Sequence, residues 1–306
     1  MVLYRLACTL RPTWLTLPIW INTECCHLSY KIHSSRLLAF VIAIWGTVVG
    51  LPSCAAGMQE SIISHSAAYE LKLVQAVSGS NIVSVEGFMS YDWSRRCDGW
   101  TNDQRLFLAL DYGQNQSVKF KAVSLTWESS DGKRFRFKIK RQGMGQEEER
   151  IEGEASLKEL GGVGEVRFEK PEAKKVRLPK GTLFPTQHMF QILAKAISGM
   201  KFDRQLVFDG DELQGAAPIT TVFLPKLAKV NLPKPVKGYT PEPVYPMSHA
   251  FFPPTSETIT QDSMPEFEMK IFYQANGVAP RIFLNYSDFK LRGDIMGFKK
   301  LSEPDC

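Results

Sequence analysis

Residues 133–142 read KRFRFKIKRQ, and this stretch decides the fold class because basic and apolar side chains alternate along it. The basic residues are Arg134, Arg136, Lys138 and Lys140, and the apolar ones are Phe135, Phe137 and Ile139. Neighbouring side chains of a β-strand point to opposite faces, so the alternation predicts a half-buried strand with a cationic outer face. An ordinary solvated face is the simpler interpretation. The sharper one is a patch for anionic envelope material, such as lipid headgroups or an acidic partner.

The same alternation recurs through most of the chain after residue 60, which predicts a fold made mainly of strands. The clearest runs are residues 69–73, 83–91, 106–112, 166–168, 176–178, 206–208, 267–273, 282–286 and 289–291. Asn276-Gly277 is a strong hairpin signal, and Asp209-Gly210 indicates a tight turn. We therefore expect a mainly all-β domain of roughly a dozen or more strands over residues 58–306.

One segment has helical spacing instead. Residues 185–199 read PTQHMFQILAKAISG, with Pro185 at the start and Gly199 at the end. Apolar residues cover much of the circumference of this helix, so we expect it to be enclosed by the sheet. A large sheet that curls around its own helix would bury both and would limit exposed sheet edges.

A proline-dense segment spans residues 225–254. It holds Pro225, Pro233, Pro235, Pro241, Pro243, Pro246, Pro253 and Pro254. We expect an extended surface segment or long loop, acting as a spacer, with a partner-docking strip as the alternative.

The N-terminal region, residues 1–57, is typical of an export leader. Basic residues precede the uncharged apolar run LLAFVIAIWGTVVGL at 37–51, and small residues follow it. We expect cleavage near residues 55–57, with a retained membrane anchor as the alternative. The sequence LPSC at 51–54 also resembles a lipoprotein box, so lipidation of Cys54 is a second option, although Pro52 fits that box poorly. No later run has spanning length, so we expect an exported, soluble protein without a transmembrane segment after cleavage.

Removing the leader changes the charge and the cysteine count. It holds four of the 37 basic and one of the 32 acidic residues, so residues 58–306 carry 33 against 31, a net charge of +2. This small excess predicts no strong attraction to nucleic acid, so we expect no nucleic-acid partner. Cys97 and Cys306 are the cysteines that remain, and in an oxidising compartment they most simply form one disulfide, worth up to about 5 kcal/mol in the chain-entropy model. A free nucleophilic Cys97 and disulfides to other chains stay open as alternatives.

Candidates for chemistry are few. The histidines after the leader, His65, His188 and His249, are far apart in sequence and form no metal motif, so we expect structural or surface roles, no metal site and no cofactor. The acidic turn of Asp209, Asp211 and Glu212 is predicted to be a solvated hairpin tip rather than a calcium loop.

Five stretches in their order along the chain carry a family resemblance. They are HSAAYELKL from His65, CDGW at Cys97, FPTQHMFQILAKA from Phe184, VFDGDE from Val207, and FYQANGVAPRIFLNYSDFKLRGD from residue 272 with the terminal Cys306. Together they resemble the cell envelope integrity protein B (EipB) family of Gram-negative periplasmic proteins. The resemblance covers residues 60–306. It implies a spiral or broken β-barrel around one helix, a Cys97–Cys306 disulfide, and a functional link to a periplasmic tetratricopeptide-repeat protein.

The family has no established catalytic residues, so the resemblance assigns none to this chain. We expect a non-enzymatic protein that supports the cell envelope by binding envelope components or a repeat-protein partner. A lipid or lipoprotein carrier, which would hold a lipid-like ligand in an apolar cavity, is the alternative. An envelope hydrolase is a third hypothesis, and it would need a cluster of acidic or Ser/His groups in a cleft.

Overall fold

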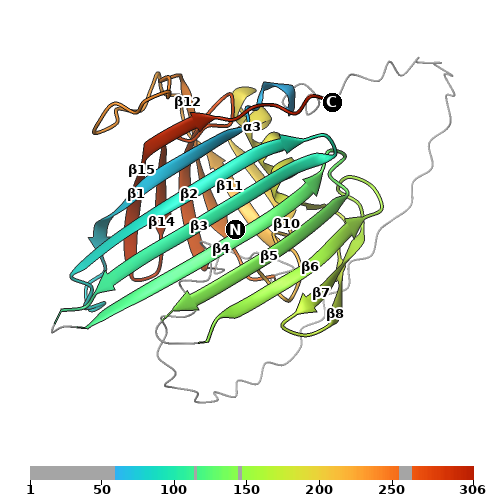
Figure 1. The fold of residues 1–306 in the computed structure, drawn as a ribbon, viewed down its shortest axis with the longest axis horizontal. Helices are drawn as coiled ribbons and strands as arrows, with labels where there is room; N and C mark the ends of the chain where they lie inside the picture. Colours follow the sequence, from blue (N-terminus) through green and yellow to red (C-terminus); the bar gives the residue numbers. More distant parts are fainter. Residues whose placement is uncertain (1–58, 114–115, 144–146, 255–263) are drawn as a thin grey trace, which may run out of the picture.

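The computed structural model describes residues 59–113, 116–143, 147–254 and 264–306 (Figure 1). Within these ranges, one sheet of fifteen strands curls around the helix α3 (Pro185–Ile197). The strands are β1 (His65–Ala76), β2 (Ser84–Arg96), β3 (Gly99–Asp111), β4 (Ser117–Ser129), β5 (Arg134–Gly143), β6 (Glu149–Leu157), β7 (Gly164–Lys170), β8 (Lys174–Leu178), β9 (Thr182–Leu183), β10 (Phe202–Val207), β11 (Ala217–Phe223), β12 (Val244–Phe251), β13 (Phe267–Gln274), β14 (Arg281–Asn285) and β15 (Phe289–Lys300). The predicted mainly β fold around one helix is confirmed.

The chain enters the sheet at its middle and builds it in two arms. The strand order is β8-β7-β6-β5-β4-β3-β2-β1-β15-β14-β13-β12-β11-β10-β9. Each arm is a succession of antiparallel neighbours, and the arms join where β1 pairs antiparallel with β15. β9 pairs parallel with β10 and is the exception. The first and last strands are therefore hydrogen-bonded neighbours, and the sheet forms a nearly closed barrel.

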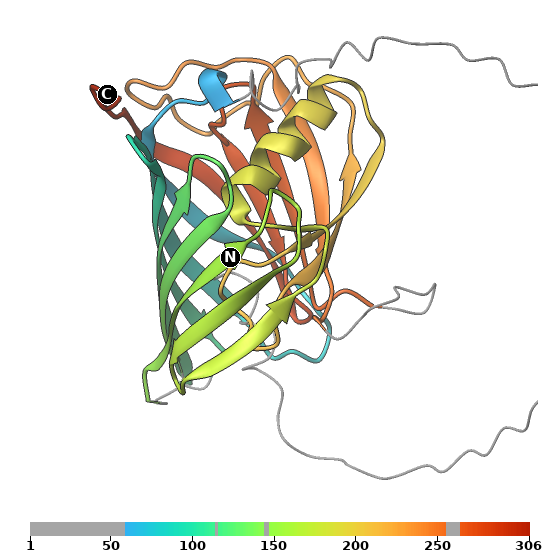
Figure 2. The same ribbon diagram turned by 90° about the vertical axis from the view of Figure 1, so that its right-hand side faces the viewer.

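The two arms form facing walls, and the helix lies between them. Figure 2 shows α3 inside one end of the curled sheet, between the wall of β1–β5 and the wall of β11–β14. The helix is enclosed as predicted, since Met189, Phe190, Ile192 and Leu193 are all buried. None of the helices within the described ranges has the length and apolar character needed to cross a membrane.

Aromatic side chains pack the helix onto the sheet. At its start, the ring of Phe184 stacks on Phe135 of β5 with centroids 5.2 Å apart. Further along, Phe190 meets Trp93 of β2 at 6.1 Å and Trp100 of β3 at 5.6 Å. Aromatic rings bury large apolar areas, so these contacts fix the position of the helix against the first arm.

The strand runs predicted from alternation correspond to ten of the strands, and β4, β6, β9, β11 and β12 were not predicted. The inward positions of β4 include Ser124, Thr126 and Glu128, which hide its alternation. In β6 the inward positions include Gly153 and Ala155, which carry little apolar surface. A pattern search based on apolar side chains misses strands of these two kinds.

The proline-dense segment is partly a strand, which corrects the expectation of a continuous surface loop. Residues 244–251 form β12, which lies between β11 and β13 and buries Val244, Met247 and Phe251. Pro246 fits because the register with β11 begins only at Met247, and its carbonyl still accepts a bond from Leu224 N. Residues 225–243 lie outside the named strands.

Candidate functional site

A cavity of about 150 Å³ lies between α3 and the inner face of the sheet, and it opens partly to solvent. Residues from both arms line it, together with the first two turns of the helix. Most of the lining is apolar or aromatic, including Met189 and Ile192 of α3, Trp93 of β2 and Tyr273 of β13. The fold therefore places an apolar pocket where the walls and the helix meet.

Part of the wall of this cavity is polar. Inward-facing Asn102 and Gln104 of β3 lie opposite Thr126 and Ser124 of β4 in the register of the two strands, and we call these four residues the inner polar strip. Asn102, Gln104 and Thr126 line the cavity. Asn102 Oδ1 is buried and has no hydrogen-bond partner among the described residues. The strip therefore gives the pocket hydrogen-bonding groups that carry no charge.

His65, His188 and His249 all line the same cavity, although they are distant in sequence. The rings of His188 and His249 lie 6.2 Å apart, and His65 lies on β1. Each is buried, which corrects the alternative of a surface role. Across the described ranges, no group of three or more His, Cys, Asp or Glu side chains is arranged to hold a metal ion.

Burial keeps these imidazoles uncharged. It lowers the pKa of His188 to about 4, helped by the nearby positive charge of Lys195, and lowers the pKa of His249 to about 3. His249 Nδ1 is 2.9 Å from Thr221 Oγ1, and His65 Nδ1 is 2.9 Å from the carbonyl of Ile63. His188 Nε2 differs, because it has no hydrogen-bond partner in the part of the chain that the structure describes.

The start of α3 is capped by a carboxylate from the sheet. Glu128 of β4 accepts hydrogen bonds from the backbone N–H groups of Thr186 at 2.7 Å and Gln187 at 3.0 Å. A carboxylate at this end also meets the favourable end of the helix dipole. Burial nevertheless raises the pKa of Glu128 to about 7, and the two backbone hydrogen bonds oppose that rise. The N-terminal amides of the helix are therefore already occupied.

The predicted solvated acidic turn is wrong, because the loop between β10 and β11 turns into the protein. Asp211 and Glu212 are buried, and Asp209 lines the cavity. Arg141 of β5 binds Asp211 through Nη2, which lies 3.0 Å from Oδ1 and 3.1 Å from the backbone oxygen. Burial raises the pKa of Asp211, and the positive charge of Arg141 opposes that rise.

The sequence analysis missed Arg141 and Glu128, which hold the acidic loop and the start of α3 in place. Arg141 continues the inward positions 135, 137 and 139 of the opening stretch, so the alternation carried a signal for it. The close approach of Gly210 to Phe137 explains why the acidic loop can lie inside. Gly210 has a φ of +81°, and a Cβ there would overlap the Phe137 ring, so glycine suits this position in two ways.

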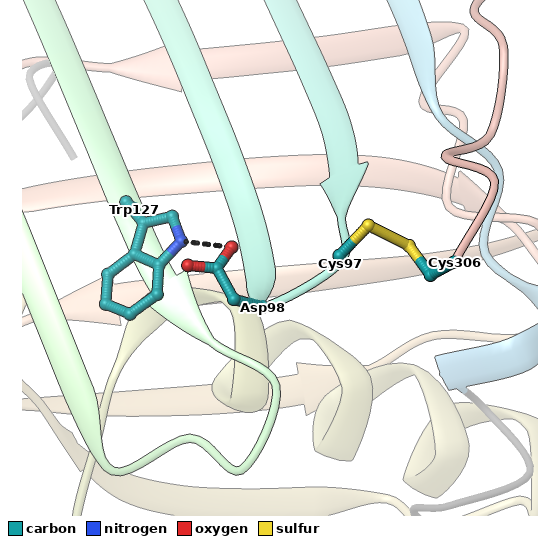
Figure 3. Close-up of a disulfide and its surroundings, with 4 residues drawn as sticks. All are labelled: Cys97, Asp98, Trp127 and Cys306. Carbon is teal, nitrogen blue, oxygen red and sulfur yellow. Dashed lines mark hydrogen bonds between the residues drawn. A yellow bond between two sulfur atoms is a disulfide. The ribbon is translucent and has the colours of Figure 1, made fainter.

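The cysteines lie at the same end of the sheet as the helix. Cys97 and Cys306 are joined by a disulfide with their Cα atoms 5.7 Å apart (Figure 3). Next to them, Trp127 Nε1 donates a hydrogen bond to Asp98 Oδ1 at 3.2 Å. The tail before Cys306 is held by Glu303, which accepts from the N–H of Ser64 at 2.9 Å. Cys54 and the rest of the predicted leader, residues 1–57, lie outside the described residues.

The cationic side chains of β5 lie on the outer face, away from the cavity. Lys138 is 3.0 Å from Glu152, and Lys140 is 4.0 Å from Glu148. The guanidinium groups of Arg134 and Arg136 lie over the ring of Trp127, at 5.5 and 4.4 Å from its centroid. These contacts give each cation a partner within the protein, as expected of an ordinary solvated face.

Comparisons with known proteins agree with this architecture. The chain is 29% identical over 258 residues to the cell envelope integrity protein EipB of Brucella abortus (strain 2308), covering 83% of this chain and 89% of that protein. A crystal structure of a beta-barrel-like protein, assigned to a domain of unknown function from Brucella abortus, matches with a TM-score of 0.69 at 27% identity. That match covers 79% of this chain and 99% of the other.

A family model described as EipB-like matches residues 56–302, which is most of the chain. The match includes β1–β15, α3 and the lining of the cavity. The disulfide is consistent with the oxidising compartment of an envelope protein. This chain belongs to the EipB-like family.

Proposed function

We propose that the protein supports cell envelope integrity from the periplasm by binding, and that it catalyses no reaction. The observation that carries this proposal is the partly open cavity between α3 and the sheet, with its mostly apolar wall and uncharged polar strip. Concave, largely apolar sites with a few polar groups are the usual form of ligand-binding pockets. The homology to a cell envelope integrity protein gives the biological setting.

The side chains of the cavity favour binding over hydrolysis. The contact between Thr221 and His249 pairs a hydroxyl with an imidazole, which is the first requirement of a nucleophile and its base. Thr221 is fully buried and does not line the cavity, so a substrate there would not reach it. The lowered pKa of His249, about 3, also makes it a weak base at neutral pH.

The size of the cavity bears on the carrier hypothesis. At about 150 Å³ it is smaller than the roughly 300–1,000 Å³ of pockets that enclose drug-sized ligands. A whole two-chain lipid would need the walls to separate, whereas a small molecule fits between them as they stand. We therefore place binding of a small ligand ahead of lipid or lipoprotein transport. As a protein partner we propose a periplasmic tetratricopeptide-repeat protein, which the family resemblance implies.

Complementation of a gene deletion tests this proposal. Cells that lack the gene should become sensitive to detergents and to large antibiotics that an intact envelope excludes. The full chain should restore resistance, and residues 58–306 expressed without the leader should fail to restore it. Full rescue by the leaderless protein would contradict a periplasmic role, and unchanged sensitivity of the deletion strain would contradict a role in the envelope.

A further inference from the structure

Two buried polar atoms without partners belong to residues of the cavity wall and come from different elements. His188 Nε2 belongs to α3, and Asn102 Oδ1 belongs to β3. His188 is only 8% exposed and lines the cavity. A polar atom buried without a partner is costly and uncommon in native proteins, and such atoms therefore indicate a missing group. A ligand in the cavity with a hydrogen-bonding head would supply it.

Over the residues that the structure describes, the lining of the cavity offers no positive charge to balance an anion. No Lys or Arg side chain is among the described residues that line the cavity. The N-terminus of α3, which could otherwise bind an anion, is taken by the carboxylate of Glu128. Asp209 adds a negative group to the lining. A phosphate or carboxylate head would therefore enter without a counter-charge and next to an acid.

The wall also disfavours a cation. Burial lowers the pKa of both His188 and His249. The wall of the cavity therefore disfavours a positive charge on these imidazoles compared with water. Among the described residues of the lining, Asp209 is the single acid that could balance a cation, and its carboxylate is already engaged by Asp211 N at 3.0 Å. An uncharged head loses less solvation on entry than either ion.

We propose that the cavity binds a small uncharged ligand that has an apolar body and one hydrogen-bonding head, and that this head bonds to His188 Nε2. The body would pack against Met189 and Ile192 of the helix and against the aromatic wall of Trp93 and Tyr273. An apolar cavity of this volume takes a molecule about the size of benzene. The inference rests on the proposed binding function and specifies the chemical class of its ligand.

Four probes of nearly equal size test the head group on the wild-type protein. They are benzyl alcohol, toluene, benzylammonium and benzoate, titrated separately at pH 7.4 and followed by NMR shifts and Trp fluorescence. We expect benzyl alcohol to bind about three- to tenfold more tightly than toluene, which corresponds to one hydrogen bond. Both ions should bind more weakly than toluene. Benzoate or benzylammonium binding as tightly as the alcohol, or no binding by any of the four probes, would overturn the proposal.

A pair of variants separates the head from the body. His188→Leu removes the hydrogen-bonding atom and keeps the bulk, so the preference for benzyl alcohol over toluene should disappear. Ile192→Val shortens the apolar wall, so both affinities should fall together and their ratio should stay as in the wild type. Thermal melts of each variant verify that it folds. If His188→Leu still prefers benzyl alcohol over toluene, a group other than His188 bonds to the head, and this assignment is wrong.

These titrations are independent of the complementation experiment. If the deletion strain is rescued as expected but the probes fail, the protein acts in the envelope and the ligand class is wrong. If the probes bind as expected but the deletion has no envelope phenotype, the ligand class holds and the envelope function is wrong.

Discussion

Two halves of the same strands carry different inner surfaces. On β3 and β4, the half near α3 presents the inner polar strip, and the far half presents an apolar surface. The apolar residues of the far half are Leu106, Leu108, Leu110, Phe120 and Ala122. The backbone pairing of β3 with β4 continues through both halves, so the sheet forms equally well with either kind of inner surface. The apolar side chains of the far half therefore fill the interior of the barrel, whereas the polar side chains of the near half border the cavity.

The ion pair between Arg141 and Asp211 borders the apolar far half, because Arg141 lies opposite Ala122 in the register of β5 and β4. Breaking this pair should have the largest effect on stability. We expect Arg141→Met to lower the free energy of unfolding by about 3–5 kcal/mol, since it leaves a buried carboxylate unpaired. Chemical denaturation measures this loss. The double variant Arg141→Met, Asp211→Leu should recover most of it, and a single variant as stable as the wild type would show that the pair contributes nothing.

Truncation compares the two halves directly. Leu108 is 0% exposed and packs against Gly87 of β2, so Leu108→Ala should cost about 3 kcal/mol through lost burial and the new cavity. Thr126→Ala, the matched change in the near half, should cost less than about 1 kcal/mol because Thr126 borders an existing cavity. Urea denaturation of both variants checks the contrast, and equal losses would remove the distinction between the halves.

Opening the disulfide affects the near half, because the C-terminus and the helix lie at the same end of the sheet (Figure 2). We expect Cys306→Ser to lower the free energy of unfolding by about 2–4 kcal/mol, since the bridge closes a loop with a sequence separation of 209. The rate of hydrogen exchange should also rise at the backbone N–H of Ser64, which donates a hydrogen bond to Glu303. Cys97→Ser should match the loss, and unchanged stability in both would mean that the tail is held without the bridge.

Acidity sharpens the comparison at the helix cap. The pKa of Glu128 is about 7 in the folded protein and 4.5 without the influence of the fold, so between these pH values the folded state binds more protons than the unfolded state. The contribution of this residue to the free energy of unfolding should therefore fall as pH rises from 4.5 to 7, by about 1–3 kcal/mol.

Glu128→Gln isolates this contribution, because it removes the titrating group and leaves the histidines in place. The two histidines act in the opposite direction, since their lowered pKa values make stability fall as pH drops below 6.5. The difference in free energy of unfolding between wild type and Glu128→Gln, measured at several pH values, should favour the wild type increasingly toward pH 4.5. A constant difference would contradict the raised pKa.

The sequence predicted the strands whose inward residues are large and apolar, and it predicted the helix from Pro185. It did not predict β4, because the inner polar strip and Glu128 interrupt the alternation where the strand meets the cavity. Proline content likewise concealed β12, although Pro246 lies where no bond from its nitrogen is needed. The irregular pattern of β4 thus reflects the cavity that this strand borders.

The candidate site was less predictable than the fold. His65, His188 and His249 come together only because β1, α3 and β12 meet around one cavity, and no spacing along the chain contains that information. The acidic loop was placed on the surface because its composition is that of a solvated turn. Its partner, Arg141, was one position beyond the run from which the strand was inferred.

The pairing of β1 with β15 has a consequence for how the molecule is made. β1 precedes β15 by more than two hundred residues, so the hairpins from β1 to β8 can form while one edge of β1 still lacks its neighbour. The sheet can therefore be completed only after β15 has paired with β1. Until then the unpaired edge of β1 can pair with the wrong strand, and a chaperone that shields this edge during folding would raise the yield of correctly closed protein.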